Sequence, residues 1–187
     1  MVTRLTMSAL AFVSCSVLTV VAQENWPQFR GETAGVVADD PALPDMWGRS
    51  ENVAWEIEIP GKGWSSPIVW GEHVFVLTAI SVSGEEIPIE PVEHYRARSL
   101  GGSMTAAFVT EVSEPLRWIL YDVDFETGAV RWERTLHTSV PSGPSHEKSS
   151  FASETPVTDG ERVYVYLADI GVFAVDFEGA DVWSVPM

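Results

Sequence analysis

The alternation of apolar and polar residues near the end of the chain predicts four short β-strands joined by tight turns. Between 162 and 167, Val and Leu alternate with two Tyr, which is the period of two of a half-buried strand. Short segments rich in Asp, Glu and Gly separate the strands and suit hairpin turns. The predicted strands span 155–158, 162–167, 172–176 and 180–185. Four consecutive antiparallel strands in about 30 residues form one blade of a β-propeller.

An earlier part of the chain repeats this pattern. Ser66-Pro67-Ile68-Val69 parallels Thr155-Pro156-Val157-Thr158, and Trp132 occupies the place of Trp183 in the last strand. The repeat predicts a first blade over about 65–135, interrupted by an insertion at 81–115, and a second blade over about 153–185. The strands expected in the first blade span 66–70, 73–79, 117–124 and 129–135.

A further amphipathic strand is predicted at 52–59, where Trp55 corresponds to Trp132. It should be the fourth strand of a blade without the first three, so 52–187 is predicted to be a partial propeller of about two blades and a leading strand. The segment 23–51 is rich in Pro and Gly and predicts a loop-rich lead-in. Its aromatic residues Trp26, Phe29 and Trp47 are expected to pack on the propeller as a lid. The fold class is therefore all-β, with four-stranded antiparallel blades.

The residues Asp124 to Trp132 read Asp-x-x-Thr-Gly-x-x-x-Trp, which resembles the repeat of pyrroloquinoline-quinone-like (PQQ-like) β-propellers. The opening Asn-Trp-Pro-Gln-Phe-Arg-Gly at 25–31 resembles the start of exported bacterial members, as does the segment 146–156. The first copy departs from the family pattern at Asp122, where Ala is usual, and the second copy keeps Ala174 but lacks the Thr. The resemblance implies a propeller, a fold that hosts many unrelated functions.

Residues 1–22 resemble a secretory signal peptide, with Arg4 followed by an apolar run and a small residue, Ala22, before the polar Gln23. This predicts export, to the periplasm or as a secreted protein, with cleavage after Ala22. Two alternatives stay open: an uncleaved membrane anchor, or a lipoprotein attached through Cys15. Cleavage would remove Cys15, the one Cys in the chain, so no disulfide is expected.

The formal net charge of −16 argues against a nucleic-acid partner, which needs a basic face. The expected partners are another protein or further blades, because the chain reads as the N-terminal part of a larger propeller. A membrane is expected to be involved only if the signal segment stays uncleaved.

Six residues are expected to have structural roles in the repeats. Each Asp should accept backbone N–H bonds in the last turn of its blade, and each Gly should take the left-handed conformation that the turn needs. Each Trp should pack against a neighbouring blade and donate its indole N–H to a backbone acceptor. These residues are Asp124, Gly128, Trp132, Asp176, Gly179 and Trp183.

The segment that links the blades contains His146, Glu147 and Lys148, which are candidates for the mouth of the propeller channel. His-Glu begins like a zinc-helix motif, but Ser150 stands where the second His belongs and nearby Pro residues oppose a helix, so a metalloprotease site is rejected. Two interpretations of these three residues stay open: they bind a ligand, or they form hydrogen bonds within their own loop. The insertion at 81–115 is expected to be either a solvent-exposed hairpin or a long loop that binds a partner.

These patterns favour an exported, non-enzymatic β-propeller that acts as a scaffold or binding module. The alternative is the N-terminal fragment of a quinoprotein dehydrogenase that uses PQQ and calcium, which needs oxygen ligands for the cation and a carboxylate base. Neither set of residues is recognisable, so no catalytic or metal residues are assigned and no cofactor is expected outside this alternative. A hydrolase is the third possibility, and no Ser-His-Asp set or Gly-x-Ser-x-Gly elbow supports it.

Overall fold

The computed structural model describes residues 25–36, 41–84, 87, 109–110, 112–146 and 149–187. All the regular elements in these residues are β-strands, and they form two four-stranded antiparallel sheets and a small two-stranded sheet. The predicted fold class, all-β with four-stranded antiparallel blades, is confirmed. Residues 1–22 and most of the predicted insertion lie outside the described residues.

The first sheet has the strand order β1-β2-β4-β5, with β1 at Ile68–Trp70, β2 at His73–Ser81, β4 at Leu116–Asp124 and β5 at Val130–Ser139. Strands β2 and β4 pair over their full length, from His73 opposite Asp124 to Ser81 opposite Leu116. Both strands are almost completely buried because the sheet is covered on each face. This sheet is the first predicted blade.

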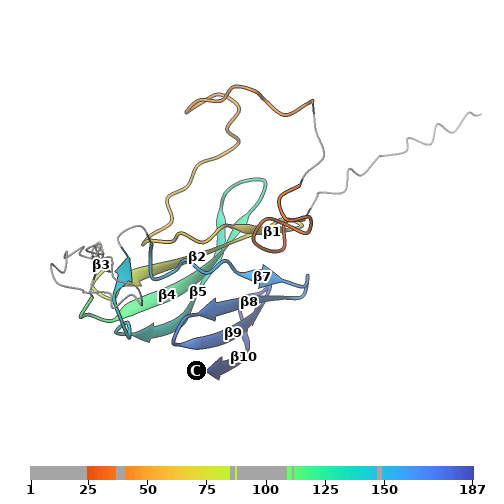
Figure 1. The fold of residues 1–187 in the computed structure, drawn as a ribbon. Helices are drawn as coiled ribbons and strands as arrows, with labels where there is room; N and C mark the ends of the chain where they lie inside the picture. Colours follow the sequence, from red (N-terminus) through yellow and green to blue (C-terminus); the bar gives the residue numbers. More distant parts are fainter. Residues whose placement is uncertain (1–24, 37–40, 85–86, 88–108, 111, 147–148) are drawn as a thin grey trace, which may run out of the picture.

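The second sheet runs β7-β8-β9-β10, with β7 at Val157–Thr158, β8 at Arg162–Leu167, β9 at Gly171–Asp176 and β10 at Asp181–Pro186. The edge strands β1 and β7 of the two sheets lie side by side (Figure 1). Ser66 N donates to Thr155 Oγ1 at 3.0 Å, so a hydrogen bond links two positions that are equivalent in the sequence repeat.

The main core lies between the two sheets. Phe75 and Leu77 of β2 and Leu120 of β4 face Val163 and Val165 of β8, and all five side chains are fully buried. Burying a side chain of this size stabilises the fold by about 1.5–3 kcal/mol. The two blades therefore share one core.

The opposite face of the first sheet packs against the predicted leading strand. Trp55, Ile57 and Ile59 are partly buried against β2 and β4, while Glu56 and Glu58 are exposed, so the side chains alternate as predicted. The segment 53–59 nevertheless forms no strand, because no described backbone pairs along it. It is an extended segment that lies across the sheet.

The lead-in joins the two blades through its first residues. Trp26 forms an antiparallel bridge with Val69 of β1, and Thr158 N of β7 donates to Pro27 O at 2.9 Å. The expectation that the lead-in aromatics form a lid is wrong for Phe29 and Trp47, which are 58% and 73% exposed. The guanidinium carbon of Arg30 lies 5.3 Å from the centroid of the Phe29 ring, and both aromatic side chains are otherwise open to solvent.

The described part of the insertion adds a small sheet in which β3 at Val109–Thr110 pairs with β6 at Ser145–His146. The insertion therefore contacts the segment that links the blades. No helix with the length and apolarity of a membrane span occurs in the described part of the chain.

Candidate functional site

The two blades are joined by a Trp that inserts over a glycine turn. Trp132 of β5 donates its indole N–H to the carbonyl oxygen of Phe177 at 2.8 Å, in the turn between β9 and β10. Gly179 of this turn has a φ of 83°, and a Cβ atom there would lie 2.9 Å from Cδ2 of Trp132. Real Cβ atoms do not approach so closely, so the indole ring needs a glycine beneath it.

Trp55 makes the same contact with the first blade. Its indole N–H donates to the carbonyl oxygen of Phe125 at 2.8 Å. Its ring covers Gly128, where φ is 72° and a Cβ atom would lie 2.6 Å from Cδ2 of Trp55. Each blade thus has one acceptor turn, and each turn receives the Trp of the segment that precedes the blade.

An Asp side chain shapes each acceptor turn. Asp124 Oδ1 accepts hydrogen bonds from Thr127 N at 2.8 Å and from Thr127 Oγ1 at 2.7 Å. The hydrogen bond from the Thr127 hydroxyl is the main cause that lowers the pKa of Asp124 below its ordinary value. In the second blade, Asp176 Oδ1 accepts from the backbone N–H groups of Glu178 and Ala180, at 3.1 and 2.8 Å. These bonds hold the turns that present the carbonyl to the Trp.

Trp183 is equivalent to Trp132 but lies on an uncovered face. It is 42% exposed, and its ring centroid lies 5.9 Å from that of Tyr164. All of β10 is exposed, and Tyr166 and Val185 are 45% and 57% exposed. Within the described residues, no sheet covers this face of the second blade.

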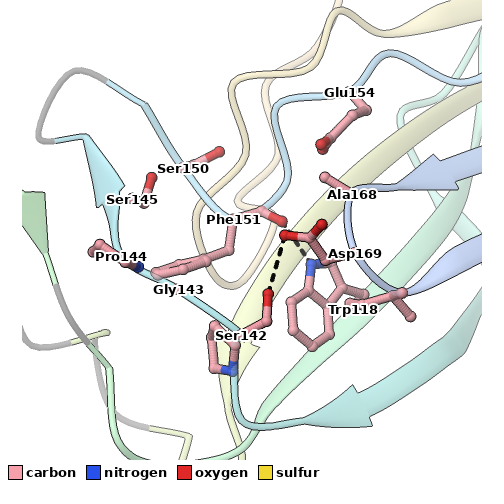
Figure 2. A pocket seen from close by; sticks show the side chains of 12 residues that line it. Trp118, Ser142, Gly143, Pro144, Ser145, Ser150, Phe151, Glu154, Ala168 and Asp169 are labelled. Carbon is pink, nitrogen blue, oxygen red and sulfur yellow. Dashed lines mark hydrogen bonds between the residues drawn. The ribbon is translucent and has the colours of Figure 1, made fainter. Parts of the chain in front are cut away.

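A cavity of about 180 Å³ lies at one end of the junction between the blades (Figure 2). It is bounded by β4, by the segment that links the blades and by the turn between β8 and β9. Its 12 lining residues are Trp118, Pro141, Ser142, Gly143, Pro144, Ser145, Ser150, Phe151, Glu154, Ala168, Asp169 and Ile170. From the viewpoint of Figure 2, Glu154 and Asp169 lie on one side of the cavity, and Pro144 and Ser145 lie on the other.

Hydrogen bonds fix the walls of this cavity. Trp118 Nε1 donates to the carbonyl oxygen of Phe151 at 2.6 Å, which ties β4 to the linking segment. Ser142 Oγ donates to Asp169 Oδ2 at 3.1 Å, which ties that segment to the β8–β9 turn. Ser150 Oγ accepts from Trp64 N at 3.1 Å and from Ala152 N at 3.2 Å. These bonds join the three segments that form the walls.

Of the three predicted candidates, the structure describes His146, which lies beside the cavity and does not line it. His146 is an exposed residue of β6, opposite Val109, and its neighbour Ser145 lines the cavity. Glu147 and Lys148 lie outside the described residues. Sequence reasoning missed Glu154 and Asp169, and the available signal was the Asp-Ile-Gly turn at 169–171.

The first blade contains a hydrogen bond between His73 and the buried Asp122, at a position where its repeat departs from the second. Asp122 is fully buried, and His73 Nδ1 lies 2.8 Å from its Oδ2. The other oxygen, Oδ1, has no hydrogen-bond partner among the described residues. Burial raises the pKa of Asp122, and the hydrogen bond with His73 opposes this rise. The equivalent position in the second blade is Ala174, so the first blade has a buried carboxyl group where the second blade has an apolar side chain.

The described residues contain no group of three or more His, Cys, Asp or Glu side chains placed to hold a metal ion.

The chain matches no protein-family model, and a search of curated proteins gives no significant match.

Proposed function

We propose that the protein is an exported, non-enzymatic β-propeller scaffold that binds a further four-stranded blade through the exposed face of its second blade. The partner blade would present a turn like those at 124–128 and 176–179, with a carbonyl acceptor and a glycine for Trp183. Export is proposed from the signal-like segment at 1–22, and the blade type from the PQQ-like repeat residues.

The observation that carries this proposal is the repeated Trp contact. Trp55 and Trp132 each donate to a carbonyl at 2.8 Å and cover a glycine, and Trp183 is the third residue at this position of the repeat. An aromatic side chain that stays partly exposed among other exposed apolar groups is typical of a protein-binding surface. The geometry of two occupied contacts specifies what the third one requires.

The outer face of the first blade is already covered, so a partner blade can bind only at the second blade. Trp55 already fills the acceptor turn of the first blade, and Ile57 and Ile59 cover the adjoining sheet face. The second blade has no such cover among the described residues. A partner blade is therefore expected at the second blade and not at the first.

The test is a chain in which residues 137–187 are repeated after Met187. The added blade then follows Trp183 at the same spacing at which the second blade follows Trp132 in the natural chain. Indole N–H exchange, measured by NMR on ¹⁵N-labelled Trp and assigned with Trp→Phe variants, should be slow for Trp183 in the extended chain and fast in the natural chain. Trp132 should exchange slowly in both chains.

The matched control is the same extended chain with Gly179→Val in the added copy only. A Val at positive φ cannot form the turn or accept the indole ring, so Trp183 should again exchange fast. Equally fast exchange of Trp183 in the natural and extended chains would refute the proposal.

A further inference from the structure

We propose that the cavity between the blades binds an organic cation, either an ammonium or a guanidinium group. The positive group would lie between the carboxylates of Asp169 and Glu154, with the aromatic walls of Trp118 and Phe151 around its carbon atoms (Figure 2). This site is separate from the exposed face that carries Trp183.

The size of the cavity limits the ligand to one small group. Sites for drug-sized ligands typically have volumes of about 300–1,000 Å³, and this cavity has about 180 Å³. This is sufficient for the end of an Arg or Lys side chain or for a small diamine.

The charge of the lining selects a cation. Asp169 and Glu154 are acidic, and none of the lining residues is Lys, Arg or His. Within the described part of the chain, neither carboxylate is a member of an ion pair. The contacts of Asp169 and Glu154 are with neutral donors, Ser142 Oγ at 3.1 Å and Ser153 N at 3.2 Å. Two carboxylates in this setting retain acceptor capacity for a charged donor.

The remaining walls favour an organic cation over a metal ion. Trp118 is only 3% exposed, and the rings of Trp118 and Phe151, with Pro141, Pro144 and Ile170, give the cavity an apolar side. Ammonium and guanidinium groups bind well where aromatic faces lie beside carboxylates. A Ca²⁺ ion takes six to eight oxygen ligands, and the described residues place no third acidic or His side chain beside Asp169 and Glu154.

The site is preorganised. Asp169 has a φ of 61°, a left-handed conformation that Asp and Asn adopt more readily than other side chains. Its bond from Ser142 and the bond between Trp118 and Phe151 join three separate segments around the cavity. A cation would therefore bind without a rearrangement of the walls.

The experiment titrates the whole protein with agmatine, which has a guanidinium and an ammonium group, and with the peptide acetyl-Gly-Arg-Gly-amide. Acetyl-Gly-citrulline-Gly-amide, which replaces the guanidinium by a neutral urea, is the ligand control. Binding is followed by calorimetry and by the shift of the Trp118 indole N–H in NMR. A saturable Kd below about 1 mM is expected for at least one of the two cations. Agmatine binding alone would indicate a free amine as ligand, and peptide binding would indicate an Arg side chain.

Two variants test the assignment of the carboxylates. Asp169→Asn keeps the left-handed turn, and Glu154→Gln keeps the acceptor for Ser153 N. Each should weaken binding about tenfold or more, since each removes one charge-assisted contact. Glu178→Gln, an exposed acid outside the cavity, should leave the Kd unchanged. Absence of saturable binding of both cations up to about 10 mM would overturn the proposal, as would equal binding of the citrulline peptide or unchanged affinity in both cavity variants.

Discussion

The indole N–H of Trp132 donates to the carbonyl oxygen of Phe177 across the junction of the two blades, at 2.8 Å. The bond connects the last strand of one sheet to the last turn of the next, 45 residues away in the chain. The indole also covers Gly179, so one side chain supplies both a buried hydrogen bond and a specific packing contact. The blades are joined by this contact as well as by their shared core.

Replacement of Trp132 should destabilise the protein far more than replacement of Trp183. Trp132→Ala removes a partly buried ring from the core between the blades and should cost about 3–5 kcal/mol. Trp183→Ala removes a side chain that is 42% exposed and should cost about 1 kcal/mol or less. Urea unfolding of both variants measures the difference. Equal losses would show that the Trp132 contact does not join the blades.

The glycine beneath Trp132 gives a second prediction, with Gly71 as its matched control. Both positions have positive φ, 83° at Gly179 and 54° at Gly71, so an Ala at either is expected to cost about 1–2 kcal/mol in strain. A Cβ at Gly179 also meets the Trp132 ring, whereas a Cβ at Gly71 has nothing within 4 Å. Gly179→Ala should therefore lower the urea midpoint clearly more than Gly71→Ala. Similar midpoints would mean that the indole moves aside freely.

The sequence predicted the blades because their side chains alternate and their turns repeat. The strand alternation, the Asp and Gly turns and the equivalence of Trp55, Trp132 and Trp183 are all local patterns, and the structure contains strands close to the predicted positions. The segment 53–59 shows where this reasoning ends. Alternation reports which side chains are covered, but a strand also needs a backbone partner, and a single segment does not reveal one.

The cavity could not be predicted in the same way. Trp118 and Asp169 are 51 positions apart and come together only because the two blades pack in one orientation. Neither residue belongs to a short motif, whereas His146 and Glu147 match the beginning of a zinc-helix motif. The exposure of Phe29 and Trp47 likewise depends on how the lead-in turns, which composition alone does not determine.

The buried Asp122 should make stability depend on pH. The pKa of Asp122 is raised mainly by burial, because burial disfavours the charged carboxylate. The protonated side chain therefore contributes to stability below the ordinary carboxyl pKa of 3.8, and this contribution is lost as the pH rises through the pKa of the folded state. His73, Arg131 and Asp124 are the charged neighbours that modify the effect. Asp122→Asn should abolish this decline in stability above about pH 4, as measured by urea unfolding across pH. A variant with the same pH profile as the natural chain would contradict this account.

Asp159 should titrate at an unusually low pH. The Tyr164 hydroxyl donates to Asp159 Oδ2 at 2.7 Å, and this bond is the largest cause that lowers the pKa of Asp159 to about 2. Because the folded pKa is depressed, the stabilisation is present above 3.8 and is lost as the pH falls towards 2. Tyr164→Phe should raise the pKa towards its ordinary value, which carboxyl ¹³C NMR titration measures. An unchanged pKa in this variant would show that the backbone donors suffice.

Export predicts a mature protein that begins at Gln23. The charged start, the apolar run and the small Ala22 before a polar residue are the features that a signal peptidase requires. N-terminal sequencing of protein recovered from the periplasm or the culture medium gives the answer. Protein that retains Met1 and fractionates with the cytoplasm would exclude export.

The contact between Trp55 and Gly128 has a consequence for self-association. A molecule with one uncovered sheet face and a complementary face elsewhere on its surface can stack on copies of itself without limit, as open filaments do. Here the complementary turn of every copy is already filled from within by its own Trp55. The Phe125 carbonyl and Gly128 of each copy are therefore not free to receive Trp183 of another copy, so we expect no head-to-tail stacking through this contact.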